Sequence, residues 1–106
     1  MKERNDIMKS IVQENKEECF LCGRMANYWQ GNIEEHHCFG GPNRKHSEKY
    51  GLKVYLHGLS CHREGDGAVH RSKEARLSVQ REAQKAFEKT HTREEFMKIF
   101  GKNYLD

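Results

Sequence analysis

The sequence predicts a small α+β protein built from a strand, a turn, a second strand and a helix around bound metal. Two strand-like segments flank a Gly-Gly-Pro turn, and a segment with helical apolar spacing follows them. The four cysteines and five of the seven histidines fall into groups along the chain that could supply ligands. Because the chain has 106 residues, of which 35% are hydrophobic, its core is thin and a structural metal is the expected support. We expect one domain over residues 1–106.

The first half of the chain contains both expected strands. Residues 1–17 are expected to form an N-terminal helix, because apolar side chains recur there at helical spacing: Ile7, Met8, Ile11 and Val12. Residues 33–39 form the first expected strand, which the glycines and proline at 40–42 end. We interpret residues 43–51 as a polar, basic loop and KVYLH at 53–57 as the second strand.

After a loop at 58–67, a long helix is expected from Ala68 to Lys89, with Asp66 as its cap. Small and apolar side chains follow one face of this helix: Ala68, Ser72, Ala75, Val79, Ala83, Ala86 and Phe87.

A last helix is expected to begin at Thr92, where Thr92 and Glu95 fit a capping box, and to stop at Gly101. We therefore expect the zinc knuckle and the strand-turn-strand-helix core within residues 18–75. Residues 76–106 would then be a helical C-terminal extension.

The cysteines predict a structural zinc site. No signal peptide or membrane span is visible, so the chain is expected in the cytoplasm, where cysteines bind metal more often than they pair. Cys19-x-x-Cys22 followed by glycine is typical of a zinc knuckle. The preferred ligand set is Cys19, Cys22, His57 and Cys61. Cys38 and His62 are alternatives to His57, and four buried thiols without metal are the simpler interpretation.

The stretch EEHHCFGG at 34–41 predicts a second, chemical site. At the end of a strand one imidazole can bind a metal while its neighbour activates a water, because imidazole is a natural base near neutral pH. His62 and His70 would complete the metal site with the pair. The carboxylates of Glu34 and Glu35 are expected as solvated strand ends, with orientation of a histidine or contact with the metal as the alternative for Glu34.

Four motifs occur in the order seen in one nuclease family: Glu34-x-His36-His37 before Gly-Gly, the VYL strand, Cys61-His62, and Gly-Ala-Val-His ending at His70. In this the chain resembles the HNH, or His-Me finger, endonucleases, over roughly residues 19–75. The resemblance implies a ββα-metal core and metal-dependent hydrolysis of DNA phosphodiester bonds. The chain looks most like small phage and prophage proteins of this type, including recombination-enhancement nucleases.

The resemblance also implies a role for each matching residue. His37 matches the general base, and His36, His62 and His70 match ligands of a catalytic divalent metal such as Mg²⁺, Mn²⁺, Ni²⁺ or Zn²⁺. Cys19, Cys22 and Cys61 match the structural zinc set, and His57 stands where the family usually has a cysteine. The family's middle asparagine is missing from YGLK at 50–53. Asn43 is the candidate that braces the connecting loop instead.

Basic side chains concentrate in the middle of the chain, where residues 41–63 carry five basic groups against one acid. These are the expected contacts to DNA phosphates: Arg44, Lys45, Lys49, Lys53 and Arg63. Tyr28 and Trp29 are expected to pack in the core or knuckle, with stacking on a base as the alternative.

Three functions fit the sequence. The preferred one is an endonuclease, with a second copy of the chain or a phage recombination protein as a possible further partner. A zinc-stabilised module that binds nucleic acid without catalysis is the alternative. The third is an interaction protein whose last helices dock a partner. No membrane association is expected, since no apolar run is long enough to span one.

Overall fold

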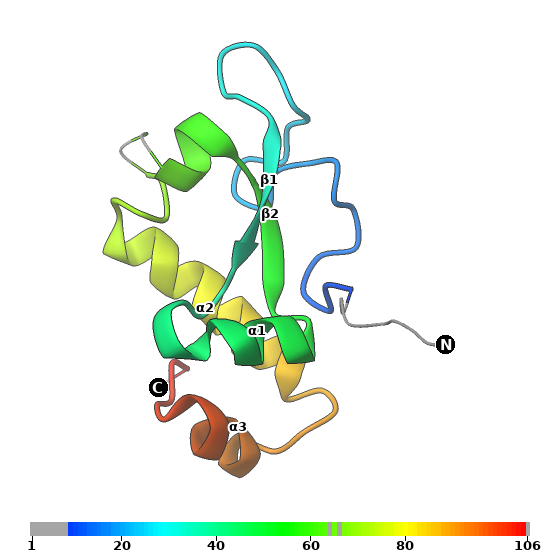
Figure 1. Cartoon of the computed structure of the whole chain (residues 1–106), viewed down its shortest axis with the longest axis vertical. Coiled ribbons are helices and arrows are strands. Elements are labelled where there is room, and N and C mark those ends of the chain that lie inside the picture. The colour runs from blue at the N-terminus through cyan, green and yellow to red at the C-terminus, as the bar shows by residue number, and fades with distance from the viewer. Residues whose placement is uncertain (1–8, 64, 66, 106) are drawn as a thin grey trace.

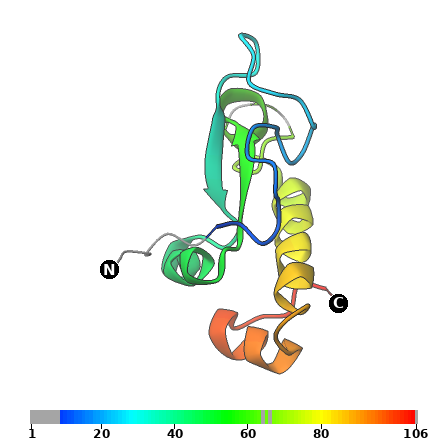
Figure 2. The same cartoon turned by 90° about the vertical axis from the view of Figure 1, so that its right-hand side faces the viewer.

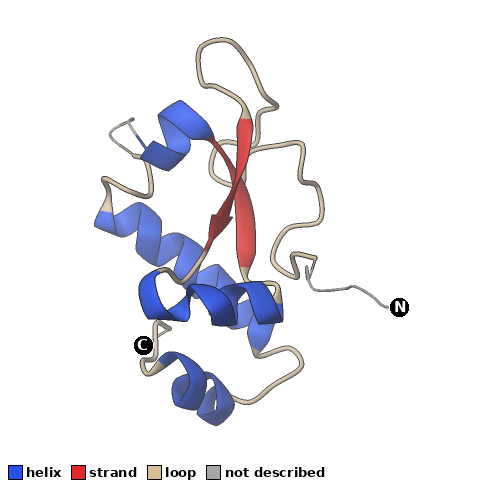
Figure 3. Cartoon of the chain, viewed as in Figure 1, coloured by secondary structure: helices blue, strands red, loops and turns tan. Residues whose placement is uncertain are grey.

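A computed structural model describes residues 9–63, 65 and 67–105. It shows a small mixed α+β structure with a two-stranded antiparallel sheet and three α-helices in the described part (Figures 1 and 3). The elements in chain order are β1 (Ile33–His37), a 3-10 turn η1 (Gly41–Asn43), α1 (Arg44–Tyr50), β2 (Lys53–His57), a π-helical turn η2 (Gly58–Arg63), α2 (Lys73–Phe87) and α3 (Arg93–Phe100).

The pairing of the two strands decides which side chains share a face of the sheet. His36 lies opposite Val54, and His37 lies opposite Lys53. Since successive residues of a strand point to opposite faces, His36 and His37 leave β1 on different sides. The strands confirm the expected segments, although β1 ends at His37 rather than at residue 39.

One buried cluster joins the sheet to the helices. Val54 and Leu56 of β2 are fully buried, and α2 contributes side chains at spacings of four: Val79, Ala83 and Phe87. Figure 2 shows α2 running alongside the sheet, with α3 beyond its C-terminal end. The described helices include none that is long and apolar enough to cross a membrane.

Residues 43–51 do not form the expected loop, because most of them belong to α1. Pro42 lies in the turn before this helix, and Gly51 ends it with a left-handed φ of 70°. Buried Ser47 fastens α1 to the end of β1, since its hydroxyl accepts from the backbone N–H of Phe39 and donates to the carbonyl of Phe39. This helix brings Glu48 toward the sheet.

The expected N-terminal helix at 1–17 is wrong for its described part, and residues 1–8 lie outside the described residues. Residues 9–17 form no helix, because tertiary hydrogen bonds hold this segment against the sheet. The N–H of Ile11 donates to the carbonyl of Gly51, and Oε1 of Gln13 accepts from the N–H of Tyr55. This segment therefore covers the outer edge of β2.

The helices of the C-terminal part match the prediction from the sequence closely, except at the start of α2. The helix begins at Lys73 rather than at residue 68, and the hydroxyl of Ser72 caps it by accepting from the N–H of Ala75. The expected cap, Asp66, lies outside the described residues. The capping box of Thr92 and Glu95 is present.

Tyr28 and Trp29 do not pack in the core. Their exposed fractions are 87% and 83%, and their rings contact each other edge to face at 5.1 Å between centroids. Both lie in the loop before β1, which an isolated bridge between Asn27 and Gly31 closes.

Candidate metal centres

Four side chains from two segments meet at the end of β2: Cys19, Cys22, His57 and Cys61. Nδ1 of His57 lies 3.3 Å from Sγ of Cys22 and 3.9 Å from Sγ of Cys61. A zinc tetrahedron with ordinary Zn–S and Zn–N bonds has an S–N edge of about 3.6 Å, and the two distances lie on either side of it. These four residues could therefore bind a metal such as zinc.

The surroundings of the four ligands suit a zinc ion. Nε2–H of His57 donates to the carbonyl of Met25 at 2.7 Å, so Nδ1 keeps its lone pair toward the sulfurs. Burial opposes ionisation of Cys19, but backbone hydrogen bonds at Cys22 and His57 outweigh it and lower the pKa of this thiol. A thiolate is the form that binds metal.

The other two candidates for the fourth zinc ligand lie elsewhere. Cys38 is a buried free thiol outside the four-residue cluster, and burial raises its pKa. His62 belongs to a second cluster, although it follows Cys61 directly in η2. Adjacent residues of this π-helical turn thus serve two different clusters.

The second cluster consists of three imidazoles from β1, η2 and the turn before α2: His36, His62 and His70. Nε2 of His62 lies 3.3 Å from Nδ1 of His36 and 3.0 Å from Nε2 of His70. The N–N edge of a zinc tetrahedron is about 3.3 Å, so this spacing also fits a metal. His70 lies in a turn rather than on the expected helix, and its backbone N–H donates to the carbonyl of His62.

Glu34 orients the central imidazole of this cluster. Its Oε1 accepts from Nδ1–H of His62 at 3.0 Å, which leaves Nε2 of His62 free to bind a metal. Arg63 also bonds to this carboxylate, and the hydrogen bonds from His62 and Arg63 lower the pKa of Glu34. A Cβ at Gly58 would lie 2.6 Å from a Glu34 oxygen, so the glycine leaves room for this carboxylate.

Two of the three imidazoles, those of His36 and His70, are favoured in the neutral form that metal binding requires. Burial lowers the pKa of His36 to about 3, and the charges of His62, His70 and His37 add to this effect. Burial and the charge of His62 likewise lower the pKa of His70.

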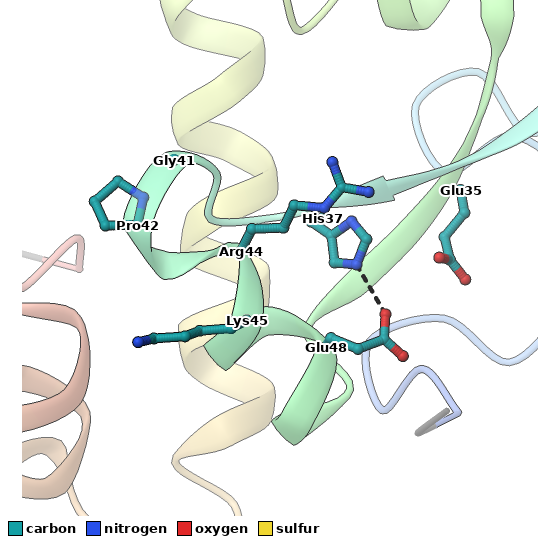
Figure 4. A pocket seen from close by; sticks show the side chains of 7 residues that line it. All are labelled: Glu35, His37, Gly41, Pro42, Arg44, Lys45 and Glu48. Atoms are coloured by element: carbon teal, nitrogen blue, oxygen red, sulfur yellow. Dashed lines mark hydrogen bonds and ion pairs between the residues drawn. The ribbon is translucent and has the colours of Figure 1, made fainter. Parts of the chain in front are cut away.

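His37 leaves β1 on the other face and contacts α1. Its Nε2 lies 2.8 Å from Oε1 of Glu48, and the other oxygen of Glu48 accepts from the ammonium of Lys53 at 2.9 Å. Burial opposes ionisation of Glu48, but the bonds from His37 and Lys53 outweigh it and lower the pKa of this carboxyl. His37, Glu48 and Arg44 are among the residues that line an open cavity of about 720 Å³, and Figure 4 shows how their side chains lie.

A neighbouring cavity of about 410 Å³ includes both kinds of histidine. Its lining consists of Glu35, His36, His37, Gly40, Gly41, Arg44, His62 and His70. His36 and His37 therefore both line this cavity, although they leave the strand on opposite faces.

The expected phosphate contacts have different surroundings. Arg44, Lys45 and Lys49 are exposed on α1. Lys53 is only 1% exposed and forms ion pairs with Glu48 and Glu35, so the prediction that it contacts phosphate is wrong. Arg63 is exposed but paired with Glu34.

Asn43 lies outside both cavities. Its Nδ2–H donates to the carbonyl of Phe100, so it braces η1 against the end of α3. Sequence reasoning assigns no role to Glu48, because it interprets residues 43–51 as a loop. The signal was present, since a proline shortly before and a glycine shortly after a charged segment are typical of a helix.

No protein-family model matches the chain, and the comparisons with curated proteins and with solved structures found no match either.

Proposed function

We propose that this chain is a metal-dependent DNA endonuclease of the HNH, or His-Me finger, type, in which β1, β2 and the segment leading into α2 form the ββα-metal core. The observation that carries the proposal is a single cavity lined by the three-imidazole cluster and by His37. Arg44 also lines this cavity, and its guanidinium suits a phosphate oxygen.

The three imidazoles would hold a divalent metal, with Glu34 orienting His62. Three protein ligands are typical of catalytic sites, because further positions stay open for water and substrate. Bound there, such an ion supplies Lewis-acid stabilisation of the charge that develops on the phosphate. An all-imidazole set favours zinc or nickel over magnesium or manganese.

His37 would act as the general base. Its Nε2 is engaged by Glu48, so Nδ1 is the nitrogen that accepts the proton of the attacking water. The water oxygen would form a bond to phosphorus while a P–O bond of the DNA backbone breaks, and the released backbone oxygen would take a proton from solvent. Arg44 would bind a phosphate oxygen and hold the backbone against the cavity.

The test is cleavage of supercoiled plasmid by wild type and by His37→Ala, each with EDTA, magnesium, manganese or nickel. Wild type is expected to nick the plasmid only with metal, and His37→Ala is expected to lose nicking while it still binds DNA. His91→Ala is the matched control, since His91 stacks on Phe87 away from both clusters. Nicking by His37→Ala at the wild-type rate would contradict the proposal.

A binding module without catalysis is the second candidate. It is favoured by the exposed basic side chains of α1, Arg44, Lys45 and Lys49, which can contact phosphates without any metal chemistry. Absence of nicking under every metal condition, together with salt-dependent DNA binding, would select this function. In either case phage or prophage recombination is the setting that the resemblance suggests.

A further inference from the structure

A chain of three side chains links the proposed base to a buried ammonium. Oε1 of Glu48 lies 2.8 Å from Nε2 of His37, and Oε2 of Glu48 lies 2.9 Å from Nζ of Lys53. An ionised carboxylate only accepts hydrogen bonds, so Nε2 of His37 is the donor in this contact. The lone pair of neutral His37 is then on Nδ1.

Rigid neighbours hold Glu48 in this place. Ser47, the preceding residue, is fully buried and exchanges two hydrogen bonds with the backbone of Phe39. The carbonyl of Ser47 also accepts from the N–H of Leu52. The middle of α1 is therefore fixed to the segment that follows β1 and to the residue that precedes β2. A site placed on rigid elements keeps its geometry better than one on a loop.

The buried ammonium of Lys53 requires the carboxylate of Glu48 as a partner. Its side chain is 1% exposed, and a buried ammonium requires acceptors. Glu48 and Glu35 provide them, at 2.9 and 3.3 Å. The oxygen and nitrogen atoms of Glu35, His37 and Glu48 are close enough to hold a metal, but the ammonium of Lys53 already supplies the positive charge between the two carboxylates.

We propose that Glu48 is a positioning residue for His37: it accepts the Nε2 proton, fixes the tautomer and holds the ring so that Nδ1 is available as the base. Lys53 binds Oε2 of Glu48 and thereby fixes the position of Oε1, the oxygen that accepts from His37. The inference about catalysis depends on the proposed nuclease function, whereas the inference about the tautomer stands on the contacts of Glu48 alone.

Glu48→Gln is the decisive variant. Lys53 has only donors, so it will take the amide oxygen of the glutamine. The amide NH2 group then faces His37 and forces Nε2 to accept, which moves the imidazole proton to Nδ1. With the wrong nitrogen protonated, kcat is expected to fall by about 10²- to 10⁴-fold, the range over which positioned bases contribute. The KM for DNA should stay within about twofold, because Glu48 touches no phosphate.

Two further variants separate this role from a merely structural one. Glu35→Gln removes the other carboxylate that pairs with Lys53, yet no hydrogen bond joins Glu35 to His37 among the described residues. Because Glu35 lines the cavity but does not bond to His37, this variant should lower kcat far less than Glu48→Gln does. In the double variant Glu48→Gln/Lys53→Met the amide is free to turn its oxygen toward His37. The double variant should therefore regain the wild-type tautomer and most of the lost kcat.

The tautomer is read without any activity assay, by ¹⁵N–¹H correlation spectra of the imidazoles at about pH 8, where an ordinary histidine is neutral. The spectrum of His37→Gln identifies the signals of His37. We expect an Nε2–H imidazole in wild type and in the double variant, and an Nδ1–H imidazole in Glu48→Gln.

An unchanged tautomer or an unchanged kcat in Glu48→Gln would overturn the proposal, as would equal losses of kcat in Glu48→Gln and Glu35→Gln. If wild type does not cleave DNA, the nuclease proposal fails while the spectra still decide the role of Glu48.

Discussion

The two clusters of metal-binding side chains differ in number, chemistry and exposure. The first, which we call the four-ligand cluster, is Cys19, Cys22, His57 and Cys61, and all of these except Cys22 are buried. The second, the three-histidine cluster, is His36, His62 and His70, and it lines an open cavity. Four ligands complete a tetrahedron, whereas three leave a position for water or substrate. On the proposed function, the four-ligand cluster would hold the fold together and the three-histidine cluster would do the chemistry.

The π-helical turn η2 joins the two clusters. Cys61 belongs to the four-ligand cluster, and the next residue, His62, is central to the three-histidine cluster. Single π-helical turns occur frequently at functional sites. Because one turn serves both, loss of the four-ligand cluster should remove both sites, while loss of the three-histidine cluster should remove only one.

The largest expected effect comes from breaking the four-ligand cluster. Cys61→Ala should prevent stable folding, since structural zinc contributes on the order of 10 kcal/mol of folding free energy in small domains. Circular dichroism melting and zinc content measure this. Cys38→Ala is the matched control: this buried thiol lies outside the cluster, and its loss should cost about 1 kcal/mol. Equal stability of the two variants would show that no metal supports the fold.

The next largest effect comes from breaking the three-histidine cluster. His62→Ala should lower metal-dependent nicking by more than about 100-fold. Mutating a residue that only orients a metal ligand typically costs about 10- to 100-fold, and loss of the ligand itself should cost more. Its melting temperature and its zinc content at the four-ligand cluster should stay close to wild type. Plasmid nicking and thermal melting are the measurements. A variant that unfolds would show that both clusters are structural.

A smaller effect is expected from the partner of His62. Glu34→Gln replaces a carboxylate that accepts from Nδ1–H of His62, and should weaken metal binding at the three-histidine cluster by about 10- to 100-fold. Titration calorimetry of protein already loaded with zinc at the four-ligand cluster gives the affinity. Glu35→Gln, one residue along β1 on the opposite face, should bind like wild type. Identical affinities for both variants would show that Glu34 does not support metal binding at the three-histidine cluster.

The smallest effect is expected on DNA binding. The double variant Arg44→Ala/Lys45→Ala should lower the slope of log affinity against log salt by about 0.9 for each phosphate contact that is lost. Fluorescence anisotropy with a short duplex at several salt concentrations measures this slope. Lys85→Ala serves as control, because Lys85 is paired with Glu82 on α2. An unchanged slope in the double variant would place the DNA on another surface.

The sequence predicts those features that depend on short-range patterns. Cys-x-x-Cys with a following glycine, the adjacent histidines before a turn and the capping box at Thr92 are all local signals, and the structure brings the residues of each cluster together as expected. The stripe of α2 is predicted for the same reason, since helical spacing is a property of one segment.

The features that the sequence did not predict depend on tertiary contacts. Lys53 is basic and was expected at the surface, but pairing with Glu35 and Glu48 allows its burial. The segment around Ile11 has helical spacing, yet the N–H of Ile11 donates to the carbonyl of Gly51, just before β2, instead of to a helical partner. The contact of Glu48 with His37 spans eleven residues and exists only because α1 folds back on β1.

The most direct test of the account is the number of metal ions in the folded chain, counted by native mass spectrometry. Wild type purified with zinc and then treated briefly with a chelator should keep one ion, and should bind a second when divalent metal is restored. His62→Ala should keep the first ion and never gain the second. A wild-type chain that binds a single ion under all conditions, or a His62→Ala chain that binds two, would contradict the division into one structural and one chemical site.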